Sequence, residues 1–272
     1  MKKRILILTI LLLTSNLFAQ QEKEFNLWGS GETFKLNPVL DGILFPSSFG
    51  LNLTSFFVNK YAESPSYSDF SFNKDDINSF DKPFMNKYNK FLDKTGDVFM
   101  ITSMALPLTL AFTDNSEWLT ILTMYAETLF LANGTKELLK DSLVRPRPYN
   151  YFSGAPQKDI EENDWHRSWP SGHATLSFAG AAFTTYVFAQ YFPDSKWKWA
   201  VAGTSYTFAL TTAVLRMCSG NHFFTDVLTG AAIGTVYGIL VPWCHTLTTN
   251  SHEKNTVNTN LEPAGFSITI NF

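Results

Sequence analysis

An arginine, a histidine and an aspartate fall within the eleven residues from Arg216 to Asp226. The planar guanidinium fork of Arg216 matches the geometry of phosphate oxygens. His222 and Asp226 are four residues apart, a spacing that places them on one side of a helical turn. A carboxylate there can hold one imidazole nitrogen and leave the other free to attack. The stretch predicts a nucleophilic site for an anion, with a core histidine beside a capping aspartate as the alternative.

Two further stretches carry cationic side chains or free backbone amides that could bind an anion. Lys140 and Arg147 lie where an apolar run ends in prolines that must stop a helix. Cations in that place either bind an anion or form a solvated helix end. In Trp169-Pro-Ser-Gly-His173, Ser171 can cap the long uncharged run that follows, with Gly172 and His173 in its first turn. The free backbone amides of such a turn attract anions.

Five apolar helices are expected to position these groups, over residues 97–113, 118–140, 173–192, 199–216 and 226–244. The second ends at Lys140 and the third begins at His173. The fourth ends at Arg216, and the fifth begins near Asp226. An antiparallel bundle would gather all of these residues at one end. The sequence therefore predicts an all-α helical bundle with one site, plus a short C-terminal strand.

The three motifs together resemble the type 2 phosphatidic acid phosphatase (PAP2) superfamily, which includes bacterial acid phosphatases and vanadium haloperoxidases. The family pattern Lys-x6-Arg-Pro falls on Lys140, Arg147 and Pro148, and Pro-Ser-Gly-His falls on residues 170–173. The pattern Ser-Arg-x5-His-x3-Asp falls on Arg216, His222 and Asp226, with Leu215 in place of the serine. The resemblance covers residues 97–245.

This resemblance implies hydrolysis of a phosphate ester through a phosphohistidine. Phosphoryl transfer needs in-line attack and cations around the equatorial oxygens. His222 would attack phosphorus, Asp226 would fix its tautomer, and His173 would protonate the leaving oxygen and then activate water. The phosphate would be bound by three cations and the start of a helix: Lys140, Arg147, Arg216, Ser171 and Gly172. No metal and no cofactor are expected.

The composition and the N-terminal residues indicate the class of protein and its location in the cell. The chain has 272 residues and is 45% hydrophobic, which fits one folded domain. Residues 1–19 have a basic start and a short apolar run, which predicts a secretory signal cleaved after Ala19, with an uncleaved anchor as the alternative. Without them the charge is 18 minus 24, or −6, which argues against nucleic acid as a partner. The chain is expected to be exported to the cell envelope.

Both a soluble bundle and a membrane-embedded one fit the helices, and the composition favours membrane association. The uncharged stretch Ala174–Phe192 would be about 28 Å long, just enough to span a bilayer. Trp197, Trp199 and Trp243 suit an interfacial belt, whereas Glu127 argues for a soluble core. In an embedded bundle, lysines in the loop after Phe192 would face the cytoplasm, so that the site would face the periplasm.

The flanking regions carry no motif. In residues 20–96, the interrupted apolar segment Pro38–Val58 predicts a docking segment or a poor membrane span. Phe80–Leu92 has helical spacing and predicts an amphipathic helix on the core or on a lipid surface. In residues 246–272, a polar tail precedes an alternating strand that would pair with the N-terminal region. Cys218 and Cys244 would be about 27 Å apart along a helix, too far for a disulfide, and are expected to be free and buried.

The apolar helices favour a phosphorylated lipid, including a prenyl diphosphate, as the substrate, and a small soluble phosphate monoester is the alternative. A lipid substrate would make the protein a membrane-associated phosphatase. A soluble monoester would make it a periplasmic non-specific acid phosphatase. Because vanadate resembles phosphate, a vanadate-dependent haloperoxidase is a further alternative. A non-catalytic envelope binding protein is the last, although it would have no reason to keep all three motifs.

Overall fold

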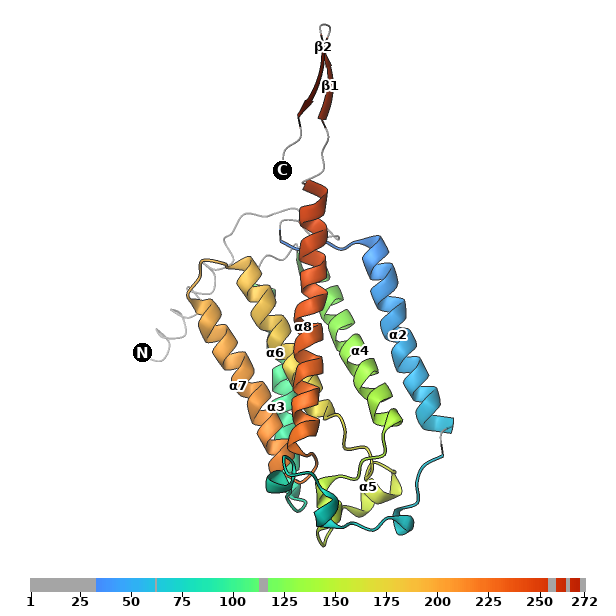
Figure 1. Cartoon of the computed structure of the whole chain (residues 1–272). Helices are drawn as coiled ribbons and strands as arrows, with labels where there is room; N and C mark the ends of the chain where they lie inside the picture. Colours follow the sequence, from blue (N-terminus) through green and yellow to red (C-terminus); the bar gives the residue numbers. More distant parts are fainter. Residues whose placement is uncertain (1–32, 62, 113–116, 254–257, 263–264, 270–272) are drawn as a thin grey trace, which may run out of the picture.

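The computed structural model describes residues 33–61, 63–112, 117–253, 258–262 and 265–269. Within these residues, the long helices run side by side as a bundle (Figure 1). They are α2 (Pro38–Tyr61), α3 (Lys90–Ala105), α4 (Trp118–Ser142), α6 (Gly172–Tyr191), α7 (Trp197–Cys218) and α8 (Phe224–Glu253). A short helix, α5 (Gln157–Glu161), lies in the loop between α4 and α6. The predicted all-α bundle is confirmed.

Three of the five expected helices begin and end within a few residues of the predicted positions. The last begins two residues before its expected start and continues nine residues beyond its expected end, to Glu253. The first also differs, because α3 spans Lys90–Ala105 and a 3-10 helix follows over Leu106–Phe112. Pro107 lies at this change, and a proline has no amide to continue the α-helical hydrogen bonds. At the other end, the side chain of Asn89 accepts from the amide of Leu92 and caps α3.

The apolar segment from Pro38 forms a continuous helix, α2, which passes through Pro46 and packs against α4. The contact is close at Gly134, where an added Cβ would lie 2.7 Å from Leu51 Cβ. Beside it, the amide group of Asn52 donates to the carbonyl of Phe130 at 2.8 Å, and Asn133 donates to Asn52 at 2.6 Å. The N-terminal region therefore forms part of the bundle.

The predicted helix over Phe80–Leu92 is wrong. One 3-10 turn covers Lys82–Phe84, and α3 begins only at Lys90. The side chain of Asn78 accepts from the amides of Phe80 and Asp81, so a local turn takes the place of a helical hydrogen-bond pattern. This segment lies against the start of α8 instead, because Asp81 bonds to Thr225.

Helices α6 and α8 make the most intimate contact of the bundle. Gly230, Gly234 and Gly238 recur every fourth residue on α8, and an added Cβ at each would meet the backbone of α6. At Gly238 it would lie 2.7 Å from the Ala179 carbonyl oxygen, and at Gly234 it would overlap that of Thr175. Small residues at this spacing let two helix backbones approach closely.

Cys218 and Cys244 form no disulfide with each other, as expected from their separation. The expectation that they are buried is wrong, because Cys218 is exposed and Cys244 is half-buried. Cys218 is the last residue of α7.

The tail contains two short strands, β1 (Asn258–Glu262) and β2 (Gly265–Thr269). They pair antiparallel with each other, with Leu261 opposite Phe266. The strand expected near the C-terminus therefore pairs with the segment just before it, not with the N-terminal region. Residues 270–272 and the predicted signal segment 1–19 lie outside the described residues.

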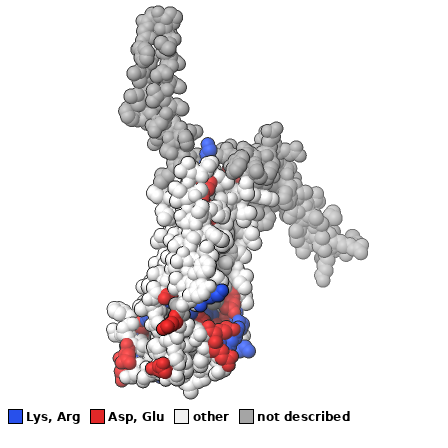
Figure 2. Space-filling model, turned by 90° about the vertical axis from the view of Figure 1, so that its right-hand side faces the viewer, with Lys and Arg blue, Asp and Glu red and all other residues white. Residues whose placement is uncertain are grey.

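The outer surface of the bundle is apolar along much of its length. Large exposed side chains occur on several helices, among them Phe49, Leu122, Leu210 and Val236. On the face shown in Figure 2, charged atoms gather near one end, and the middle of the bundle is almost free of them. Among the described residues, one segment, Phe224–Thr246 of α8, is long and apolar enough to cross a membrane, with a mean hydropathy of 1.6.

We predict that Gly234→Ala lowers the free energy of unfolding by about 1–3 kcal/mol, the usual cost of an overpacked contact. The matched control is Gly203→Ala in α7, where an added Cβ meets nothing within 4 Å. The control should be neutral or slightly stabilising, because alanine favours a helix by about 1 kcal/mol over glycine. Unfolding of the two purified variants in detergent tests this. Equal stability of both would show that α6 and α8 do not need the glycine.

Candidate active site

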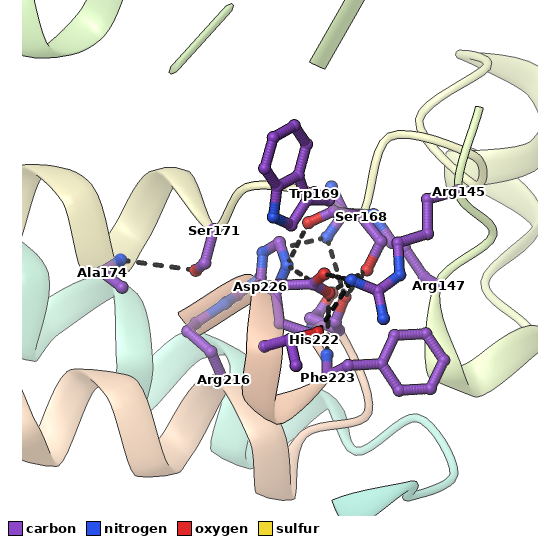
Figure 3. A network of polar contacts seen from close by, with 12 residues as sticks. Arg145, Arg147, Ser168, Trp169, Ser171, Ala174, Arg216, His222, Phe223 and Asp226 are labelled. Atoms are coloured by element: carbon purple, nitrogen blue, oxygen red, sulfur yellow. Dashed lines mark hydrogen bonds and ion pairs between the residues drawn. The ribbon is translucent and has the colours of Figure 1, made fainter. Parts of the chain in front are cut away.

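The three motifs lie together at one end of the bundle, as predicted (Figure 3). Lys140 is in the last turn of α4, and Arg147 is in the loop that follows. Ser171 is the N-cap of α6, and its hydroxyl accepts from the amide of Ala174. Arg216 ends α7, and His222 lies in the turn between α7 and α8. Opposite helix directions thus bring two helix starts and two helix ends to one place.

His222 is buried and held in one orientation. Its Nδ1 lies 2.7 Å from the carbonyl oxygen of Ser168. Because a carbonyl can only accept, Nδ1 carries the proton and Nε2 keeps its lone pair. Nε2 faces the guanidinium of Arg147, with Nη1 at 3.5 Å. The free nitrogen therefore points toward the cations, which is where a nucleophile for a bound anion must point.

Burial, helped by the positive charges of Arg147 and Arg216, lowers the pKa of His222 well below its usual value. The imidazole is therefore neutral over the whole physiological pH range. A neutral imidazole can attack phosphorus, whereas an imidazolium cannot.

Asp226 is placed differently from the sequence-based expectation. Its Oδ2 lies 3.7 Å from His222 Nδ1, beyond hydrogen-bond distance. Instead the carboxylate pairs with Arg145, accepts from the hydroxyl of Ser168 at 2.5 Å and accepts from the amide of Phe223 at 2.8 Å. The direct hydrogen-bond partner of His222 is thus Ser168, and Asp226 orients the histidine through the residues around it.

Both arginines of the motifs face a carboxylate. Arg147 Nη2 lies 2.5 Å from Asp164, and Arg216 Nη1 lies 2.5 Å from Asp93. Burial alone would raise the pKa of Asp164, but the charges of Arg147 and Lys140 lower it. Both guanidinium groups are buried, so their charges act at short range and with little screening by water.

His173 lies in the first turn of α6, with its Nε2 2.8 Å from Asp97 Oδ1. Arg216 Nη1 is 3.8 Å from the same oxygen. Asp97 therefore links the histidine of the second motif to the arginine of the third. The neighbouring Gly172 leaves room for Lys136, because an added Cβ there would lie 3.2 Å from Lys136 Cε.

Several residues that the motifs do not include complete the site: Asp81, Asp93, Asp97, Lys136, Arg145 and Ser168. Asp93 and Asp97 are four apart at the start of α3, a spacing that puts both on one face. This signal is present in the sequence, but nothing in the sequence shows that the face meets Arg216. Arg145 lies two residues before Arg147, at a position that the first motif leaves unspecified.

Asp81 joins the N-terminal region to the site. Its carboxylate accepts from the amide and hydroxyl of Thr225 and lies 2.6 Å from Arg145 Nη2. Arg145 therefore bridges Asp81 and Asp226. Burial would raise the pKa of Asp81, but the hydrogen bonds from Thr225 and Asn78 and the charge of Arg145 lower it.

We predict that Asp81→Asn lowers the free energy of unfolding at pH 7 by about 3 kcal/mol, because it leaves a partly buried arginine with one carboxylate fewer. The matched control is Asp75→Asn in the same loop, where the carboxylate pairs with Lys82 in solvent. That exposed pair should contribute nothing measurable. Chemical denaturation of both variants provides the comparison. A similar loss in both would mean that the link to Arg145 and Thr225 is not what stabilises this loop.

We also predict a pH effect from His222. Its folded pKa is lowered, so below about pH 6.5 the unfolded chain binds a proton that the folded chain does not. Stability should therefore fall as the pH drops from 7 to 5. In His222→Gln, which cannot titrate, the fall should be smaller. Melting temperatures of both proteins at several pH values in phosphate-free buffer measure this fall in stability. An identical change of melting temperature with pH in both proteins would contradict a neutral buried His222.

Comparisons with known proteins agree with this site. Residues 121–249 match the PAP2 superfamily. Over 76 residues the chain is 41% identical to a lipid A 1-phosphatase of Porphyromonas gingivalis, an alignment that covers 28% of this chain and 16% of that relative.

Two solved structures are similar at low identity. The crystal structure of Aquifex aeolicus LpxE has 21% identity and a TM-score of 0.41, covering 65% of this chain and 98% of that one. A transmembrane PAP2 type phosphatidylglycerolphosphate phosphatase from Bacillus subtilis has 18% identity and a TM-score of 0.43, covering 77% and 97%. The resemblance that the three motifs predict is confirmed over residues 121–249, which match the PAP2 superfamily.

Proposed function

We propose that this protein is a phosphatase that removes a phosphate group from a lipid, through a covalent phosphohistidine. The observation that carries the proposal is the free Nε2 of His222, which is buried beside Arg147 and kept neutral. Lys140 and Arg216 add positive charge around it, since both lower its pKa. A buried lone pair surrounded by cations suits attack on a phosphate group and has no use in a purely structural core.

In the first half-reaction, His222 Nε2 attacks phosphorus and the bond from phosphorus to the ester oxygen breaks. Arg147, Arg216 and Lys140 stabilise charge on the equatorial oxygens, helped by the amides at the start of α6. His173 gives its proton to the leaving alkoxide. In the second half-reaction, His173 takes a proton from water, which attacks the phosphohistidine and releases inorganic phosphate. Neither half-reaction calls on a metal ion or cofactor.

The carboxylates that face the cations fit this cycle. Burial lowers the pKa of His173 to about 4, and the hydrogen bond between its Nε2 and Asp97 opposes this shift, so that Asp97 would help His173 to carry the proton that the leaving oxygen needs. Asp164 and Asp93 neutralise Arg147 and Arg216 between turnovers. When a dianionic phosphate binds, the guanidinium groups can turn part of their hydrogen bonding toward it, because each has five donors.

Two observations support a lipid as the substrate. The curated relative that matches over 76 residues is a lipid A 1-phosphatase. The bundle also carries exposed apolar side chains along its length, with charge gathered near one end (Figure 2). We propose that it lies in a membrane of the cell envelope with the site at the bilayer surface, where a lipid phosphate is found.

A pocket of about 300 Å³ opens beside the site and gives room for a headgroup. Lys140 and Asp164 line its inner side, and Asn59, His166 and Arg167 line the rest. The polar lining suits a hydroxylated or charged headgroup more than an acyl chain. Asn59 comes from α2, so the N-terminal region takes part in substrate choice under this proposal. A periplasmic orientation and a cleaved signal segment remain predictions.

The experiment measures phosphate release by the purified protein with EDTA present. Lipid A, phosphatidic acid and a prenyl diphosphate in detergent are compared with a soluble aryl phosphate. We expect a lipid phosphate to be hydrolysed at least tenfold faster than the aryl ester, and His222→Ala to lower the rate at least 10³-fold. Comparable rates on the aryl ester would instead indicate a non-specific acid phosphatase. Retained turnover in a folded His222→Ala protein would exclude the phosphohistidine.

Lys140→Met and Lys198→Met form a matched pair for the phosphate-binding role. Lys140 lies in the last turn of α4 at the site, whereas Lys198 is in the first turn of α7, at the far end of that helix from Arg216. We expect Lys140→Met alone to lower kcat/KM. Equal activity of the two variants would remove Lys140 from the site. Halide oxidation on adding vanadate would reveal a haloperoxidase in place of a phosphatase.

A further inference from the structure

A second polar cluster lies inside the bundle, far from the active site. It consists of Asp41 in the first turn of α2, Glu127 in α4 and His245 in α8. His245 follows the start of α8 by 21 residues, which corresponds to about 30 Å along the helix at ~1.5 Å per residue. The phosphatase mechanism uses none of these three residues. Glu127 and His245 are completely buried.

The hydrogen bonds of His245 fix its tautomer. Nδ1 lies 2.9 Å from the carbonyl oxygen of Val241, one turn earlier in α8. A carbonyl can only accept, so Nδ1 carries the proton. Nε2 lies 2.8 Å from Asp41 Oδ1 and 3.7 Å from Glu127 Oε2. A histidine that donates Nδ1–H to a carbonyl and presents Nε2 to other groups has the arrangement common among metal ligands.

The charges and the unsatisfied polar atoms of the cluster suit a bound cation. With Nδ1 protonated, a neutral imidazole would place the Nε2 lone pair against a carboxylate oxygen, which is repulsive. A proton on Nε2 would satisfy Asp41 but not Glu127, because both carboxyl oxygens of Glu127 are buried and have no hydrogen-bond partner among the described residues. Leaving a buried carboxyl without a partner is costly. One divalent cation would satisfy all three side chains.

The geometry agrees with a single ion. One ligand atom from each residue lies within 4.8 Å of the others. Two ligands bound at ~2.1 Å to one ion stand about 3.0–3.4 Å apart at angles of 90–110°, so small side-chain shifts suffice. Two carboxylates, a neutral imidazole and a divalent ion sum to zero charge, which suits a buried place. The side chain of Asp41 is 19% exposed and gives the ion a way in.

We propose that Asp41, Glu127 and His245 bind one divalent transition-metal ion, with Zn²⁺ as the probe, and that this ion fastens α2 to α4 and α8. A mixed nitrogen and oxygen set with an imidazole favours this class over Mg²⁺ or Ca²⁺, which prefer oxygen alone. The role is structural: the ion holds the N-terminal helix onto the bundle and takes no part in phosphate hydrolysis.

The test uses the full chain, purified in detergent without a histidine tag and stripped with EDTA. Zn²⁺ or Co²⁺ is added, the excess is removed, and metal per chain is measured by mass spectrometry, with the visible absorption of Co²⁺ as a second readout. We expect one ion per chain and a higher melting temperature with Zn²⁺. Glu127→Gln and His245→Gln should each lower the metal affinity at least tenfold and lose the gain in melting temperature.

Glu117→Gln is the matched control. Glu117 is also a buried carboxylate, at the N-cap of α4, but it lies 3.3 Å from the hydroxyl of Tyr191 and outside the cluster. It should bind metal as the unchanged protein does. Wild-type protein that folds and binds neither ion would overturn the proposal, as would Glu127→Gln protein that binds as tightly as Glu117→Gln. Because these readouts do not involve phosphate release, they stand whether or not the proposed phosphatase activity is found.

Discussion

The close packing of α6 on α8 is the constraint on which the site depends. Glycines at every fourth residue of α8 let its backbone lie against that of α6, with no side chain between them. The contact continues to the helix starts, where the amide of Ser171 donates to the Asp226 carbonyl oxygen at 3.0 Å. The Pro-Ser-Gly-His motif is therefore fixed relative to the turn that carries His222. A wider separation would part the nucleophile from the helix start proposed to bind phosphate.

Charge balance is the second constraint. The site buries two guanidinium groups, which would be unfavourable if they were unpaired. Asp164 and Asp93 provide the compensating charges for Arg147 and Arg216. The same carboxylates compete with the substrate for the arginines. An incoming anion must attract the arginines more strongly than these carboxylates do, which favours a dianionic phosphate over singly charged anions.

The helical bundle and the gathering of the motifs at one end of it could be predicted from the sequence. The motifs indicate the site residues, and the directions of the helices indicate where those residues meet. Apolar runs that alternately end and begin at Lys140, His173, Arg216 and Asp226 predict an antiparallel bundle with one site. The hydrogen-bond partners of Asp226 could not be predicted from the sequence, because its distance from His222 depends on where Ser168 and Arg145 lie in three dimensions. A spacing of four residues shows that two side chains share a face, not that they touch.

The N-terminal region was the least predictable part, for a physical reason. α2 contains Pro46 and Gly50, which normally disfavour a helix, and its stability comes from packing against Gly134 of α4, which local propensity does not contain. In the same way, the apolar spacing over Phe80–Leu92 predicts a helix, but the side chain of Asn78 and the contact between Asp81 and Thr225 favour a loop. Tertiary contacts outweighed local pattern in both places.

Three carboxylates of the site, Asp81, Asp93 and Asp97, come from a part of the chain that the family match does not cover. All three precede residue 121, where the family match begins, yet they hold Arg145, Arg216 and His173. The segment that defines the family therefore contains the cations and the nucleophile but only some of their counter-ions, since Asp164 and Asp226 lie inside it and the other three lie outside. Moved into another protein, residues 121–249 would lose the carboxylates that face Arg216 and His173. The boundary drawn by sequence similarity and the boundary of the electrostatic unit differ in this protein.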